Sequence, residues 1–158
     1  MHSLSKSLIL LACAACLGAG AALADIATYT TILSGANEVP PNASTAGGAA
    51  TIVVDTETLQ AAWTLEFDGL SAAQTGAHFH TAPAGANGGV AFGLPLGSPV
   101  NGIWAMTAGQ LADLAAGNIY VNVHTTAFPG GEIRGQMELS SVVSNDEASF
   151  GAVKALFR

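Results

Sequence analysis

The chain has 158 residues, with 11 acidic against 4 basic side chains and a net charge of −7. A chain this acidic is not expected to bind nucleic acid or an anionic membrane surface, and it should attract cations instead. Its length suits one domain that buries a hydrophobic core of its own.

The first 24 residues have the layout of a secretory signal peptide. Lys6 precedes an apolar run that ends in the Ala-Leu-Ala segment 22–24, which fits an A-x-A cleavage site. The run is rich in Ala and Gly and short for a membrane span, which needs about 20 apolar residues. We therefore predict a secreted, periplasmic or surface-attached protein whose mature chain begins at Asp25. An uncleaved anchor and a lipoprotein attached through Cys13 are the alternatives.

Cleavage at this point changes the inventory of chemical groups. Both cysteines, Cys13 and Cys16, leave with the signal peptide, so the mature chain has no disulfide framework and no thiolate metal site. Three basic and 11 acidic side chains remain, a net charge of −8. We expect no membrane span and no nucleic-acid partner for this mature chain.

From Asp25 onward, short β-branched or alternating segments are separated by Gly, Pro, Asn and Ser turns. In one of them, Trp63 and Leu65 point to one side while Thr64 and Glu66 point to the other, as in a half-buried strand. The strands predicted in this way span residues 26–33, 49–54, 59–67, 77–80, 90–94, 102–105, 118–125 and 132–139. Many short strands between turns predict an all-β fold, an antiparallel sandwich or barrel.

One short helix interrupts the strands, and a compositional change ends them. Thr107 and Gln110 fit a capping box, and Gly117 suits the position just after the helix. Residues 141–158 are predicted to form a C-terminal tail, frayed or helical and docked on the sheets. A recognition tag for export or surface attachment is the sharper alternative for this tail.

Three histidines remain in the mature chain, and all lie on predicted strands. His78 and His80 are two residues apart, so a strand projects both from the same face. In the segment 119–124 (IYVNVH), apolar residues alternate with polar ones, which puts His124 on the polar face of its strand. If the two strands are neighbours, three imidazoles meet in one patch.

Neutral imidazole is the commonest metal ligand in proteins and suits Cu, Zn, Fe and Ni. Because nitrogen ligands bind copper more tightly than zinc, we predict a site for copper, with zinc second, formed by His78, His80 and His124. Three protein ligands would leave one coordination position open. The alternative is that these histidines are polar residues on a solvated strand face.

Other polar residues near these motifs are candidates for supporting the site. Asn122, Glu132 and Arg134 are predicted to orient the histidines or to bind an anion beside the metal. Arg134 could also hold a carboxylate of a partner, or pair with Glu132 or Glu138 across strands, a contact worth little if exposed. Glu38, in a turn stiffened by two prolines, is expected to tie its loop by accepting backbone N–H bonds. A ligand role is the alternative for Glu38.

Four segments, LSGANEVPP, GAHFHTAPAGANGGV, IYVNVHT and FPGGEIRGQ, occur in this order. Together they closely resemble the CHRD domain, which is named for chordin and also occurs in single-domain secreted bacterial proteins. The resemblance runs from about Thr31 to Leu139 and implies an antiparallel Greek-key or immunoglobulin-like β-sandwich, here assigned to residues 25–140. The family pattern has histidines in the HFH and VNVHT motifs, and the three histidines match it. In chordin, the domain belongs to an extracellular protein that binds growth factors.

A looser similarity is to Cu/Zn superoxide dismutase, also a Greek-key sandwich. That enzyme has copper ligands on a His-x-His strand and on a later Val-x-His strand, with an arginine nearby. In this chain, His78, His80, His124 and Arg134 are similar to that arrangement. The zinc-loop histidines, their aspartate and the cysteine pair have no counterpart in the sequence. Analogy of fold does not establish activity.

Three functions follow from these observations. The leading prediction is a secreted protein that binds or handles one metal ion without catalysing a reaction. The second is a copper-dependent enzyme acting on superoxide, since the sequence has none of the hydrolase or phosphate-loop motifs that would suit another chemistry. The third is a metal-free module that binds an extracellular protein.

Overall fold

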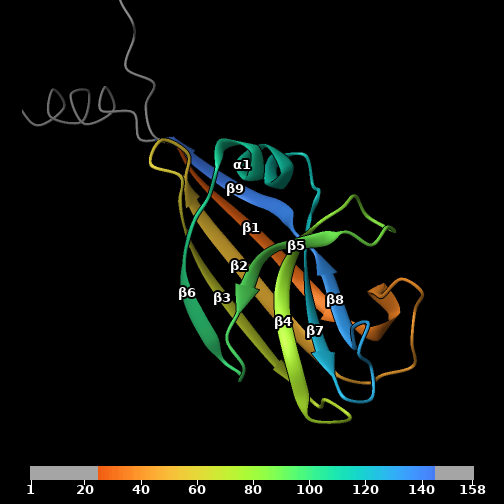
Figure 1. Ribbon diagram of the computed structural model, residues 1–158. Coiled ribbons are helices and arrows are strands. Elements are labelled where there is room, and N and C mark those ends of the chain that lie inside the picture. The colour runs from red at the N-terminus through yellow and green to blue at the C-terminus, as the bar shows by residue number, and fades with distance from the viewer. Residues whose placement is uncertain (1–24, 145–158) are drawn as a thin grey trace, which may run out of the picture.

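The computed structural model describes residues 25–144, and within them it confirms the predicted all-β fold (Figure 1). The predicted signal peptide and the tail beyond residue 144 lie outside the described residues. The elements are β1 (Asp25–Ser34), η1 (Gly35–Asn37), β2 (Gly47–Asp55), β3 (Gln60–Asp68), β4 (Gln74–Thr81), β5 (Gly89–Leu94), β6 (Val100–Ala105), α1 (Ala108–Ala115), β7 (Ile119–Thr125), β8 (Ile133–Gln136) and β9 (Glu138–Ser144). No helix in this part of the chain is long and apolar enough to cross a membrane.

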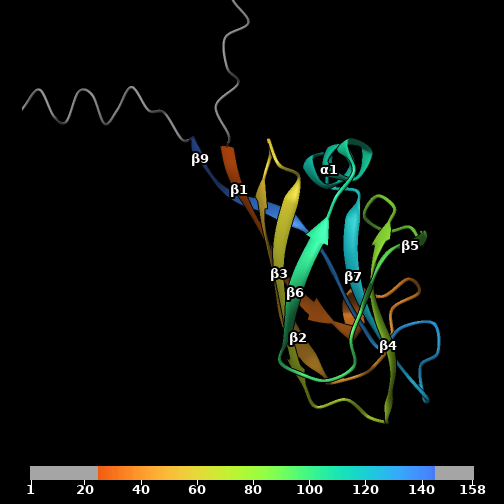
Figure 2. The same cartoon turned by 60° about the vertical axis from the view of Figure 1, so that its left-hand side comes forward.

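The strands form one antiparallel sheet that folds back on itself into two layers (Figure 2). Its order is β5-β4-β7-β8-β1-β2-β3-β6. Strand β1 joins the layers, because it pairs with β2 along its length and meets β8 where Ser34 lies opposite Arg134. On the edge of β1 that does not face β2, its first part pairs with β9, which lies off the main path of the sheet.

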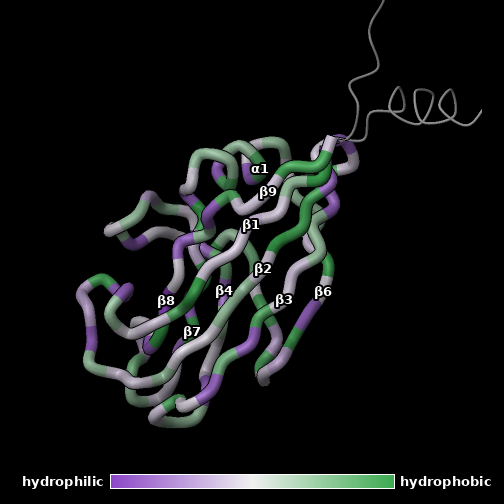
Figure 3. The backbone as a smooth tube through the Cα atoms, turned by 180° about the vertical axis from the view of Figure 1, so that it is seen from behind, coloured by the Kyte–Doolittle hydropathy of each residue, from purple (hydrophilic) through white to green (hydrophobic). Residues whose placement is uncertain are grey.

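The inner faces of both layers carry the apolar residues that the period-two pattern predicts. Trp63 and Leu65 of β3 are buried, whereas Thr64 and Glu66 between them are exposed. Along β3 and β6, hydrophobic and hydrophilic stretches alternate (Figure 3). Phe79 of β4 joins the layers, since its ring meets that of Trp63 edge-on at 6.3 Å and stacks on another tryptophan ring at 5.6 Å. The side chains of β4 and β7 that alternate with this core therefore point outward.

The prediction of a single strand at residues 132–139 is wrong, because this segment forms two strands, β8 and β9. Strand β8 pairs with β7, whereas β9 pairs with β1. The chain changes partner at Met137, whose side chain is fully buried and whose N–H donates to the Ile119 carbonyl. A continuous alternating pattern shows which residues face inward, but it carries no sign of a change of partner. Strand β9 also continues past residue 140, the predicted end of the domain, to Ser144.

The predicted helix is α1, which lies across one end of the sheets (Figure 1). Both bonds of the capping box are present, because the Gln110 N–H donates to Thr107 Oγ1 and the Thr107 N–H donates to Gln110 Oε1. After the helix, Gly117 adopts a φ of 73°, a left-handed conformation that glycine tolerates best. Leu114 anchors the helix to the core.

Candidate metal centre

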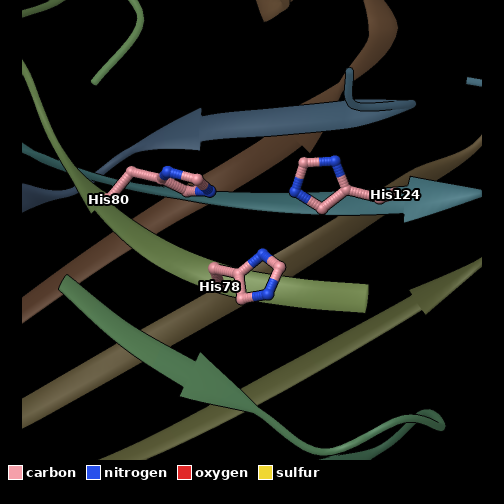
Figure 4. Close-up of side chains that lie close together, drawn as sticks. All are labelled: His78, His80 and His124. Carbon is pink, nitrogen blue, oxygen red and sulfur yellow. The ribbon is translucent and has the colours of Figure 1, made fainter. Parts of the chain in front are cut away.

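The two histidine-bearing strands are neighbours, as the three-histidine prediction requires. Strands β4 and β7 pair in antiparallel register, with His80 opposite Tyr120 and His124 opposite Gly76. The ring centroids lie 5.4 Å apart for His78 and His80, 5.1 Å for His78 and His124, and 5.9 Å for His80 and His124. One nitrogen of each ring faces a shared space (Figure 4), and the candidate ligand atoms lie within 4.8 Å of one another. The three side chains can therefore hold one metal ion together.

Gly76 leaves room for this arrangement. It lies directly opposite His124 and two residues before His78 on the same face. A Cβ atom at this position would come within 3.1 Å of His78 Cε1 and 3.9 Å of His124 Cδ2. A side chain there would therefore compete for space with the histidine rings.

Two backbone carbonyls orient two of the three histidines, His80 and His124. The Nδ1 atom of His80 lies 3.1 Å from the Gly88 carbonyl oxygen, and that of His124 lies 3.1 Å from the Pro129 carbonyl oxygen. A carbonyl only accepts hydrogen bonds, so each Nδ1 carries the proton and each neutral ring keeps its lone pair on Nε2. Such bonds are typical of histidines that bind metals, because they set both tautomer and ring orientation.

One nitrogen of each imidazole is buried and lacks a hydrogen-bond partner among residues 25–144. These atoms are Nε2 of His80, Nε2 of His124 and Nδ1 of His78. Buried polar atoms almost always find a partner, because an unmade hydrogen bond costs free energy. A metal ion bound between the three rings would give all of these nitrogens a partner at once.

Burial also keeps two of the rings neutral. It lowers the pKa of His80 and of His124, and the bonds to Gly88 and Pro129 offset this effect only in part. Because a metal ligand must be unprotonated, a lowered pKa favours metal uptake at neutral pH.

Much of the polar face of β4, β7 and β8 is buried, although His78 and His124 are only half-buried. Tyr120, Asn122 and Arg134 are each only 2% exposed, and His80 is 8% exposed. Three loops contact this face: the β1–β2 loop (residues 35–46), the β4–β5 loop (residues 82–88) and the β7–β8 loop (residues 126–132). His80, Tyr120, Asn122 and Arg134 thus form a second, polar interior under these loops, and His78 and His124 lie half-buried beside it.

Arg134 is stacked within this polar interior and makes no hydrogen bond to Glu132 or Glu138, so the predicted pairing across strands is wrong. Its guanidinium carbon lies 3.7 Å from the centre of the Tyr120 ring, and its Nη2 donates to Gln136 Oε1 at 3.0 Å. The other neighbour of the Tyr120 ring is His80, stacked at 4.9 Å. Because β4 and β8 flank β7 on opposite sides, the Tyr120 ring lies between Arg134 and His80.

Asn122 and Glu132 both bind loops. The Asn122 Nδ2 donates to Glu38 Oε2 at 3.3 Å and lies 3.5 Å from the Gly130 carbonyl oxygen. The Glu132 carboxylate accepts hydrogen bonds from Ser44 Oγ at 2.8 Å, the Ser71 N–H at 2.7 Å and Thr125 Oγ1 at 2.7 Å. Asn122 lies opposite His78 in the pairing of β4 with β7. The contacts of Glu132 are with hydroxyl groups and a backbone amide rather than with the imidazoles.

The Glu38 carboxyl group is only 5% exposed and lies over Asn122. Burial raises its pKa to about 7, against the lowering effects of the Arg134 charge and the Asn122 hydrogen bond. Its Oε1 has no hydrogen-bond partner within the described part of the chain. At neutral pH, this carboxyl group is therefore close to the balance between its charged and uncharged forms.

We expect Glu38→Gln to stabilise the protein in alkaline solution. A carboxyl pKa raised on folding means that the native state binds more protons than the unfolded state between about pH 4.5 and 7. The stability from this group is therefore full below pH 4.5 and is lost as the pH rises to 7. Glutamine does not ionise, so the variant should exceed the wild type by roughly 1–3 kcal/mol at pH 8, since one pKa unit corresponds to about 1.4 kcal/mol. Urea unfolding at pH 4, 6 and 8 measures this gain, and a gain equal at all three values would contradict the argument.

The order of motifs in the sequence agrees with a comparison of this chain with known families. The family model described as the CHRD domain matches residues 29–137. This chain belongs to the CHRD domain family. No curated protein and no solved structure matches the chain, so its similarity to superoxide dismutase stays a prediction. The CHRD match includes all three histidines and the three loops that contact the polar face.

The sequence did not reveal several residues that contact the histidines of this site. Tyr120 lies on the same face of β7 as Asn122 and His124. Its spacing of two and four residues from them is the only sequence signal that could have identified it as part of the site. Gly88 and Pro129 act through backbone carbonyl oxygens, which no residue type reveals. The roles of Gly88 and Pro129 depend on how their loops fold, which brings these carbonyl oxygens to the histidine rings.

Proposed function

We propose that this CHRD domain binds one transition-metal ion through His78, His80 and His124, without catalysing a reaction. The observation that carries the proposal is the convergence of three buried imidazole nitrogens that lack a partner among residues 25–144. Copper is the first choice and zinc the second, because imidazole ligands bind Cu(II) more tightly than Zn(II). Two of the rings are held neutral in the tautomer that a metal needs.

A metal-binding role has more support than a superoxide-consuming enzyme. An arginine that attracts a small anion to a metal should face that metal, but the Tyr120 ring lies between Arg134 and His80. The three nitrogens are also out of contact with solvent. A metal-free binding module has less support still, because it would leave these buried nitrogens unsatisfied.

We also propose that the protein acts outside the cytoplasm. The charged start, apolar run and A-x-A site of residues 1–24 support secretion. A secreted or periplasmic location suits a copper site formed by histidines alone, since it would not depend on thiols that oxidise there. An extracellular protein partner is a further candidate.

The test is a calorimetric titration of metal-free protein, residues 25–158, with Cu(II) and with Zn(II). We expect one ion to bind per chain, and none to bind tightly to a variant in which all three histidines are replaced by Ala. A superoxide-consumption assay on copper-loaded protein should show no more activity than the triple variant mixed with copper. Activity well above that level would favour the enzyme, and absence of stoichiometric binding would leave the metal-free module.

A further inference from the structure

We propose that the β1–β2 loop positions the metal ligands, by holding in place the two loops whose carbonyl groups orient His80 and His124. This inference rests on the proposed function and concerns residues that are not ligands themselves. The loop contacts each of its neighbours through an asparagine side chain, Asn87 on one side and Asn42 on the other. Each contact holds a loop whose carbonyl oxygen contacts a different histidine.

The first connection runs from the β1–β2 loop to His80. Asn87 Nδ2 donates to the Val39 carbonyl oxygen at 2.7 Å. The next residue, Gly88, accepts the bond from His80 Nδ1 and donates its own N–H to the Tyr120 hydroxyl group at 3.1 Å. Because the Tyr120 ring stacks on His80, this one peptide segment holds both partners of the stack.

Gly88 can serve in this way because it has no side chain. A Cβ atom there would overlap the Thr81 carbonyl oxygen and lie 2.9 Å from the Ala82 Cβ. The β4–β5 loop therefore folds back closely on the end of β4. Its only side-chain hydrogen bond to the β1–β2 loop, among the described residues, is the one from Asn87.

The second connection runs from the β1–β2 loop to His124. Asn42 Nδ2 donates to the Glu132 carbonyl oxygen at 3.0 Å and to the Gly131 carbonyl oxygen at 3.3 Å. Its Oδ1 accepts the Ser44 N–H at 2.9 Å, which sets the direction of the amide. The Asn42 side chain thus holds the β7–β8 loop, whose Pro129 carbonyl oxygen accepts from His124 Nδ1.

The two connections should act on the metal separately. Loss of the outer contacts that orient metal-bound histidines typically weakens metal binding by about 10- to 100-fold. Asn87 serves His80, whereas Asn42 serves His124. A residue that only stabilised the fold would have no such preference for one ring.

The experiment compares Asn87→Ala with Asn42→Asp, and uses Asn101→Ala as the control. Asn87 is exposed, and Asp at position 42 keeps the acceptor for Ser44 while removing the donor, so both variants should fold. Asn101 is an exposed asparagine of β6, on the other layer of the sheet. Nitrogen-15 NMR of the imidazoles in metal-free protein reports the tautomer of each ring, and titration with Zn(II) reports affinity.

We expect Asn87→Ala to reduce the Nδ1–H tautomer of His80 alone, and Asn42→Asp to reduce that of His124 alone. Each should weaken Zn(II) binding about 10-fold, whereas Asn101→Ala should match the wild type. Equal effects of each variant on both rings, or no effect on either ring, would overturn the inference. The tautomers are measured without metal, so a wild-type protein that binds no metal would refute the proposed function and leave this test standing.

Discussion

Replacing His80 or His124 with Ala should weaken Cu(II) and Zn(II) binding by at least about 100-fold in each case. Losing the contacts around a metal ligand already costs about 10- to 100-fold, and these changes remove the ligand itself. The remaining two nitrogens come from one strand in His124→Ala and from two strands in His80→Ala. The effect should nevertheless be similar, because each ring presents one buried nitrogen to the same space.

Competition with a chelator of known affinity measures these losses, and thermal unfolding supplies a second readout. A ligand that binds only the native state raises its stability, so one equivalent of metal should raise the melting temperature of the wild type and not of either variant. Gln60→Ala is the control, because Gln60 is an exposed residue of β3. Wild-type affinity in either histidine variant would contradict the three-histidine site.

Glu132→Ala should destabilise the protein by about 3–5 kcal/mol, the largest stability change that we expect. Glu132 is fully buried, and its two carboxylate oxygens accept three hydrogen bonds from three segments of the chain. Alanine would leave the Ser71 N–H and two hydroxyl groups without their acceptor, and a buried donor left unpaired costs about 1–3 kcal/mol. The lost side-chain volume adds to this cost.

The effect of Glu132 should also depend on pH. Burial raises its pKa, but the hydrogen bonds from Thr125, Ser71 and Ser44 outweigh this and lower it overall. A lowered carboxyl pKa means that the stability is present above the unfolded value, near 4.5, and is lost as the pH falls through the native value. The advantage of the wild type over Glu132→Gln should therefore be largest near neutral pH and shrink in acid.

Urea unfolding curves of Glu132→Ala and Glu132→Gln at pH 3 and pH 7 measure both effects. Glu57→Ala serves as the matched control, since Glu57 is exposed in a turn, and a surface change of this kind usually stays within about 0.5 kcal/mol. A loss in Glu132→Ala no larger than that in Glu57→Ala would show that the carboxylate does not hold the three segments together.

The strands could be predicted from local pattern because a sheet buries one face of each strand. Trp63 and Leu65 alternate with Thr64 and Glu66, and the structure buries the first pair while exposing the second. The same pattern did not reveal the break at Met137. Which neighbour a strand pairs with depends on contacts that are distant in sequence, and inward-facing residues look the same beside either partner.

The polar face shows the corresponding limit for the site. His78, His80 and His124 could be placed on outward faces from their spacing alone. Much of that face is nevertheless buried, because residues more than 30 positions away fold over it: Glu38 contacts Asn122, and Gly88 contacts Tyr120. Polarity indicates a solvated face only when no other polar segment supplies the hydrogen bonds that water would make.

The sequence by itself determined the all-β class, the capped helix, the family and the three imidazoles as a candidate metal set. These depend on periodicity and on ordered motifs, which are local properties of the chain. The tertiary structure alone decided that β4 and β7 are neighbours, that Tyr120 lies between Arg134 and His80, and that backbone carbonyls set the tautomers of His80 and His124. The reason is physical: a carbonyl oxygen is present in every residue, and only the path of the loops determines which one meets an imidazole.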